Sequence, residues 1–287
     1  MKHSLIRSVG ALALGVLAAA MPASAQKQAT ALTVKGSDTM VNLSAAWAEA
    51  FMKANAGSDV VVNGGGSGVG IAALFNGTTD ICNSSRDIKP AETRKAAESG
   101  INVVGLDVAL DGIAIAVHPK NPIKEITMDQ LKQIYTGEVS NWKDINGVDS
   151  RILVYSRETS SGTYVFFQEH VLKFEDYSSS ARLMPATSAI VEAVATDENA
   201  IGYVGLGYAA TAKDRIKVIP VKADANAPAI VPTEATVRDR SYSIARALHC
   251  YTNGTPKGLA KSFLDFCISP EGQKIVAEQG YVPLPEK

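Results

Sequence analysis

The feature that most constrains this fold is a repeated pattern of an apolar strand, a loop rich in Gly, Ser and Thr, and an amphipathic helix. The clearest copy joins the apolar run at residues 151–155 to a helix whose apolar face extends to Phe174. Similar loops follow the runs at residues 32–34, 60–62 and 80–82. Strands that alternate with helices through short loops predict an α/β fold, with mainly parallel sheets flanked by helices.

Four of these strand-end loops share one chemistry, because each offers hydroxyl groups, glycine or arginine. Ligands of open α/β sheets bind at the carboxyl ends of the strands. A helix that begins there also presents unpaired N–H groups and the positive end of its dipole to an anion. Each loop alone is equally well explained as a helix cap or a turn, but four in series favour a site for a small oxyanion. The predicted site residues, including Asp111 at the start of a later strand, are Ser37, Asp38, Thr39, Ser67, Ser85, Arg86, Asp111, Arg157, Ser161, Gly162 and Thr163.

The N-terminus has the composition of a secretory signal peptide. Lys2 and Arg7 precede an apolar run at residues 9–20, and small residues at 23–25 form a cleavage site. We therefore predict a signal peptide over residues 1–25, cleaved near Ala25, and a secreted mature chain. No later run is long enough to span a membrane, so no direct membrane insertion is expected.

Charge and cysteine content narrow the class of protein further. The formal net charge is −1, and the charged residues are spread along the chain, which argues against nucleic acid as a partner. The three cysteines are Cys82, Cys250 and Cys267, and neither they nor the four histidines match a metal-binding pattern. We expect no metal and no cofactor. The cysteines either include one disulfide, between Cys250 and Cys267, or are all buried thiols.

Several motifs, in order along the chain, resemble those of the PstS-type phosphate-binding proteins. The motifs are GSDTM at 36–40, the glycine run at 64–70, SSR at 84–86, DGIA at 111–114, the segment 157–163, and PKG with SPEG between 256 and 272. The resemblance covers essentially the whole mature chain. It implies a two-lobed periplasmic-binding-protein clamshell with the ligand in the cleft. Lobe 1 would comprise residues 26–112 plus 245–287, and lobe 2 residues 113–244.

The resemblance also implies a function without catalysis. The protein would be a periplasmic monomer that binds inorganic phosphate and delivers it to the membrane permease of a phosphate ABC transporter. Arg157, Ser161, Gly162 and Thr163 match the family's Arg-x-x-x-Ser-Gly-Thr motif fully, and Ser67 matches the serine after the glycine run.

The first and third loops depart from the family's pattern. Asp38 and Thr39 stand where the best-known members have threonine and an aromatic residue, and Ser85 stands where many have aspartate. The acid that accepts the phosphate proton therefore stays open. It is either Asp38, whose charge Arg86 would offset, or Asp111, which could instead hold Arg86 in place.

Two other functions compete with phosphate binding. The chain could bind another oxyanion, such as sulfate, molybdate or tungstate, or it could be a secreted phosphatase. The phosphatase is disfavoured, because no loop pairs a serine with a histidine or lysine as base and no carboxylate cluster suggests a catalytic metal. An acidic side chain in the site favours phosphate over sulfate, because phosphate still carries a proton that a carboxylate can accept.

Overall fold

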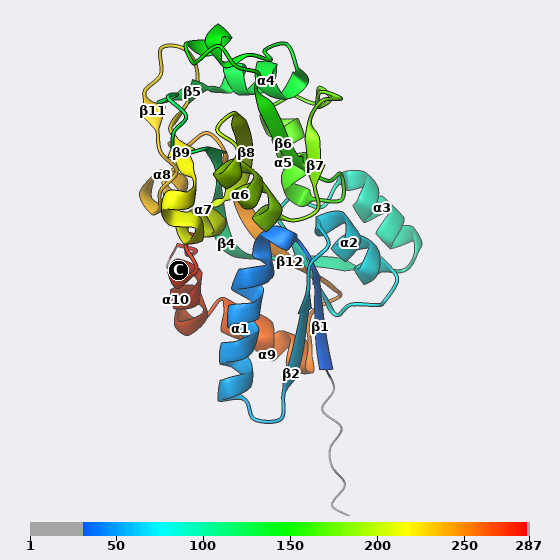
Figure 1. Cartoon of the computed structure of the whole chain (residues 1–287). Coiled ribbons are helices and arrows are strands. Elements are labelled where there is room, and N and C mark those ends of the chain that lie inside the picture. Colours follow the sequence, from blue (N-terminus) through cyan, green and yellow to red (C-terminus); the bar gives the residue numbers. More distant parts are fainter. Residues whose placement is uncertain (1–30, 286–287) are drawn as a thin grey trace, which may run out of the picture.

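The computed structural model describes residues 31–285, so the predicted signal peptide lies outside the described residues. One group of elements combines the N-terminal part of this range with its C-terminal end (Figure 1). Its strands have the order β2–β1–β3–β12–β4, in which β1 is parallel to β2 and β3, whereas β12 is antiparallel to both neighbours. The elements of this group besides β4 are β1 (Ala31–Gly36), η1 (Asp38–Met40), α1 (Val41–Ala54), β2 (Asp59–Asn63), α2 (Ser67–Phe75), β3 (Ile81–Ser84), α3 (Pro90–Glu98), β12 (Ala245–Asn253), α9 (Gly258–Cys267) and α10 (Pro270–Glu278).

The second group is built from the middle of the chain. Its strands have the order β4–β8–β6–β7, with β9 also paired to β4, and a small separate sheet has the order β11–β10–β5. The strands are β5 (Ile126–Thr127), β6 (Leu153–Arg157), β7 (Arg182–Met184), β8 (Ala200–Gly205), β9 (Lys217–Ile219), β10 (Val221–Lys222) and β11 (Ala229–Ile230). The helices are α4 (Met128–Thr136), η2 (Trp142–Ile145), α5 (Gly162–His170), α6 (Thr187–Thr196), α7 (Leu206–Ala212), η3 (Lys213–Arg215) and α8 (Glu234–Arg238).

Strand β4 (Val103–Val117) belongs to both groups. Residues 103–112 pair with β12, and residues 113–117 pair with β8. From the sequence, separate strands are expected at residues 102–104 and 111–117, and the structure joins them into one. The predicted parallel order holds for β1–β3 and for β6–β8. Because β4 leaves the first group and β12 returns to it, these two strands run in opposite directions.

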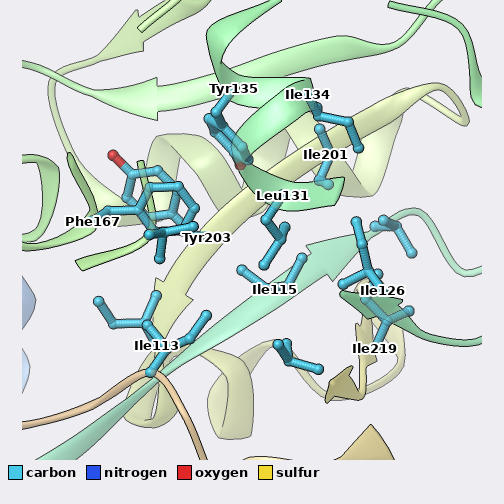
Figure 2. Close-up of a cluster of buried hydrophobic side chains, with 14 of the residues drawn as sticks. Ile113, Ile115, Ile126, Leu131, Ile134, Tyr135, Phe167, Ile201, Tyr203 and Ile219 are labelled. Carbon is cyan, nitrogen blue, oxygen red and sulfur yellow. The ribbon is translucent and has the colours of Figure 1, made fainter. Parts of the chain in front are cut away.

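Each group has its own buried core. Trp47 and Phe51 of α1 pack in the first core with Phe263 of α9. In the second core, the ring of Phe167 stacks on that of Tyr203 with centroids 4.3 Å apart (Figure 2). Removing these aromatic and aliphatic side chains from water is the main force that stabilises each group.

The two ends of α4 follow from the sequence. Thr127 and Gln130 have the spacing that predicts a capping box, for a helix that ends at Gly137. The capping box is present, and Gly137 ends α4 in the left-handed conformation, so both predictions are confirmed. The predicted apolar face through Phe174 is wrong at its end, because α5 stops at His170 and Phe174 is 75% exposed with φ of 69°. None of the described helices is long and apolar enough to cross a bilayer.

The cysteines agree with the second of the two alternatives. Cys82, Cys250 and Cys267 all lie within the described range, and all three are buried free thiols there. The Cys250 thiol donates to Asn83 Oδ1 at 3.2 Å, so Cys250 has a polar partner on the neighbouring strand β3.

Candidate functional site

Hydroxyl groups from four strand-end loops meet between the two cores. Thr163 Oγ1 lies 2.8 Å from Thr39 Oγ1 and 3.5 Å from Ser85 Oγ. Ser67 Oγ accepts a hydrogen bond from the Ser85 N–H at 3.1 Å. All four side chains are buried. We call these residues, Thr39, Ser67, Ser85 and Thr163, the hydroxyl cluster.

Helix α5 begins at this cluster. The hydroxyl of Ser161 caps the helix by accepting from the N–H groups of Thr163 and Tyr164. A Cβ atom added to Gly162 would lie 2.2 Å from Ser67 Oγ and 2.8 Å from Ser85 Oγ, so only glycine allows this approach. The first turn of α5 therefore places the positive end of the helix dipole beside the hydroxyl cluster, which favours an anion there.

Arg246 on β12 supplies a positive charge to the cluster and is not among the predicted site residues. Its guanidinium donates to Thr163 Oγ1 at 3.0 Å and to the Ser85 carbonyl at 2.6 Å. The same guanidinium holds the carboxylate of Asp111, which lies on β4 and also accepts from the Leu206 N–H at 3.0 Å. Complete burial raises the pKa of Asp111, and the charge of Arg246 opposes that shift. An arginine within the apolar run from Ile244 to Leu248 was the available signal in the sequence, because arginine is rarely buried without a partner.

Arg157 and Asp38 form a second charged pair. Arg157 Nη1 lies 3.3 Å from Asp38 Oδ2 and donates to Thr187 Oγ1 at 2.6 Å. The guanidinium also donates to the carbonyls of Met184 and Pro185. Burial lowers the pKa of Arg157, and the carboxylate of Asp38 opposes the shift.

The second core helps to position Arg157. The backbone N–H of Arg157 donates to the hydroxyl of Tyr203 at 3.2 Å, and this hydroxyl also bonds Ser156 Oγ at 2.7 Å. Because Tyr203 is fully buried and stacked on Phe167, the end of β6 is fixed to the core.

The structure corrects the expected role of Arg86. Its guanidinium forms two 2.8 Å bonds to the carboxylate of Glu92 in the first turn of α3. From the sequence, Arg86 was expected either to offset the charge of Asp38 or to be held in place by Asp111. In the structure Asp38 pairs with Arg157, and Asp111 pairs with Arg246. The pairing follows from local geometry, because Arg86 lies shortly before the N-cap residue Lys89 and Glu92 is the acidic residue in the first turn of α3.

The remaining predicted residue, Ser37, is buried at the N-terminus of η1. Within residues 31–285 its hydroxyl has no hydrogen-bond partner, so this group is free to donate to a ligand. No group of three or more potential metal-ligating side chains lies together in the described part of the chain.

Comparison with known proteins agrees with this fold. A family model described as a PBP superfamily domain matches residues 22–271. The phosphate-binding protein PstS of Staphylococcus saprophyticus is 36% identical over 246 residues, covering 83% of this chain and 76% of the relative. PstS of Bacillus subtilis is 34% identical over 263 residues, covering 90% and 82% respectively.

A solved structure shows the same arrangement. It is a putative phosphate ABC transporter substrate-binding protein with bound phosphate from Clostridium perfringens, 33% identical with a TM-score of 0.80. The match covers 89% of this chain and all of that one. Fold and site thus define an α/β substrate-binding protein of the periplasmic binding protein class. Within this class, the chain belongs to the PstS-type phosphate-binding protein family. The family and fold class inferred from the sequence motifs are confirmed.

Proposed function

We propose that this chain binds inorganic phosphate and delivers it to the membrane permease of a phosphate ABC transporter. The observation that carries the proposal is the position of Thr163 Oγ1. It contacts Thr39, Ser85 and Arg246 at once, so hydroxyl donors and a guanidinium converge beside the start of α5. Such preorganised neutral and charged donors suit a compact tetrahedral oxyanion. The relatives named above are phosphate-binding proteins, and one of them is a structure with bound phosphate.

The predicted ligand set stays part of this proposal. Phosphate near neutral pH carries a proton and therefore needs an acceptor as well as donors. Asp38 and Asp111 are the acids of the site, and a carboxylate there would repel fully ionised sulfate. The protein would act by binding alone, as a monomer secreted to the periplasm after cleavage near Ala25.

We also propose that the two predicted lobes, with the boundaries given above, move relative to each other. Contacts between lobe 1 and lobe 2 support closure around an ion. The Gly68 N–H donates to the Ser160 carbonyl at 2.9 Å, and Lys89 pairs with Glu169 at 3.1 Å. Both contacts join residues of lobe 1 to residues of lobe 2. Phosphate would enter between the lobes and be enclosed when they meet.

Calorimetric titration of the mature chain with phosphate, sulfate and molybdate tests the proposal. The indole N–H groups of Trp47 and Trp142 bond the carbonyls of Gly272 and Asn199, outside the hydroxyl cluster, so calorimetry reports on the site more directly than tryptophan fluorescence. We expect phosphate to bind with a dissociation constant of about 1 μM or lower, or roughly 8 kcal/mol. Displacement of phosphate by equal sulfate would favour another oxyanion, and turnover of a phosphate ester would favour a phosphatase.

Two variants test whether phosphate binds at the hydroxyl cluster. Thr163→Val keeps the shape of the side chain but removes the hydroxyl that three residues contact. Thr196→Val is the matched control, because its hydroxyl only bonds carbonyls within α6. We expect the first variant to weaken phosphate binding by about tenfold or more, and the control to bind as the wild type does.

A further inference from the structure

Helix α6 begins without a side-chain cap from its own segment. Its N-cap residue is Ala186, which makes no side-chain capping bond. The N–H of Thr187, the first residue of α6, instead donates to Asp38 Oδ2 at 2.8 Å. Asp38 is 149 residues earlier in the chain and starts η1, beside the first core. Because a helix start needs acceptors for its first N–H groups, Asp38 caps α6 from the opposite lobe.

The same carboxylate oxygen also meets Arg157. Asp38 Oδ2 lies 3.3 Å from Arg157 Nη1, and the Arg157 side chain is 2% exposed. A guanidinium and the positive end of a helix dipole together stabilise an anion. The carboxylate of Asp38, which belongs to lobe 1, therefore occupies an anion-binding position that residues of lobe 2 form.

A third contact involves the backbone of the same residue. The hydroxyl of Tyr208 on α7 donates to the Asp38 carbonyl at 3.1 Å. Tyr208 belongs to the buried cluster that also contains Ile190 and Val194 of α6. The side-chain carboxylate and the backbone carbonyl of Asp38 are thus both bonded by residues of lobe 2.

We propose that Asp38 is a closure latch, a positioning residue whose carboxylate holds lobe 2 against lobe 1 with or without ligand. On this view Asp38 stabilises the closed arrangement and does not accept the proton of phosphate. The proposal rests on the proposed function only for the identity of the ligand. The latch itself consists only of contacts between residues of this chain.

The latch has a distinct thermodynamic consequence. Removing it lowers the population of the closed state, and every anion that binds the closed state then binds more weakly by the same factor. Entry of the ligand becomes faster, because the lobes open more often. A proton acceptor behaves differently, because its loss weakens phosphate and improves sulfate binding.

The first test measures the distance between the lobes without ligand. Spin labels are placed at the exposed residues Ala97 of α3 and Ser179, while the three native thiols are buried. We expect one short distance for the wild type and a broad, longer distribution for Asp38→Ala. Asp38→Asn should lie between them, because asparagine still caps a helix but lacks the charge that pairs with Arg157. Asp59→Asn, at an exposed carboxylate of β2, is the control. An unchanged distribution in Asp38→Ala would overturn the proposal.

The second test titrates the same variants with phosphate and sulfate. For Asp38→Ala, the latch predicts that both affinities fall by a common factor between about 5 and 150, the usual range for coupled states. If Asp38→Asn weakens phosphate binding and strengthens sulfate binding, Asp38 is the acceptor and the latch is refuted. If the wild type fails to bind phosphate, the proposed function is refuted, and the ligand-free distances still decide whether the latch exists.

Discussion

The guanidinium of Arg246 holds the carboxylate of Asp111 through two bonds to one oxygen. Nε lies 3.2 Å and Nη2 2.9 Å from Asp111 Oδ2, and the side chains are 2% and 0% exposed. The pair joins β12 to β4, where the chain passes between its two groups of elements. Arg246 also reaches the hydroxyl cluster, so one buried pair serves both the connection between the lobes and the site.

Arg246→Leu should destabilise the protein by about 3–5 kcal/mol, because it leaves Asp111 as an unpaired buried charge. Urea unfolding measures the change. The double variant Arg246→Leu/Asp111→Leu should recover a large part of that loss, since no charge is then left buried. A double variant that is less stable than either single variant would show that the pair itself stabilises the fold.

Arg157→Ala should weaken phosphate binding and also lower stability. The side chain satisfies the carbonyls of Met184 and Pro185, and each buried acceptor left without a donor costs about 1–3 kcal/mol. Arg157→Lys should restore only part of either property, because an ammonium cannot reproduce the planar fork. Thermal unfolding and calorimetric titration separate the two effects.

Arg215→Ala is the control for this prediction, because Arg215 makes an exposed pair with Glu192. The control should change both measurements little. Wild-type stability in Arg157→Ala would mean that water replaces the lost donors.

Gly162→Ala should impair closure more than folding. The added methyl would meet Ser67 and Ser85, which belong to the other lobe. We expect phosphate affinity to fall by about tenfold or more, with a small change in the melting temperature. A large loss of stability with unchanged affinity would contradict this expectation. Calorimetric titration and thermal unfolding measure both.

The cysteines should react slowly with thiol reagents at pH 8. Burial raises the pKa of Cys250 to about 12 and moves the pKa of Cys82 and Cys267 upward as well. Since a raised pKa lowers the thiolate fraction, the thiolate form that reacts is scarce at pH 8. Iodoacetamide labelling of the native chain should therefore be much slower than labelling in denaturant. Equal rates would show that the thiols are accessible.

The sequence predicted the elements that depend on local chemistry. The strand-end loops, the capping box at Thr127 and the glycine end of α4 are set by residues close in sequence, and these signals are strong. The hydroxyl cluster was predicted for a related reason, because the carboxyl ends of neighbouring strands lie together.

The charge pairing could not be predicted in the same way. Asp38 and Arg157 are 119 positions apart, and Asp111 and Arg246 are 135 apart. Which acid meets which arginine depends on how the two groups are placed, and local patterns do not contain that information. The sequence alone suggested that Arg86 could pair with Asp38. In the structure Arg86 instead pairs with Glu92, six residues later in the chain.

The shared strand β4 makes the protein a single folding unit in spite of its two cores. Its fifteen residues pass from one core to the other without a linker, and β12 runs alongside it. Loss of either core removes the partner strands of one half of β4 and weakens the other half of the same strand, so the two cores are coupled. Heat or denaturant should therefore melt both lobes in one transition, while opening of the cleft bends the two strands and breaks neither.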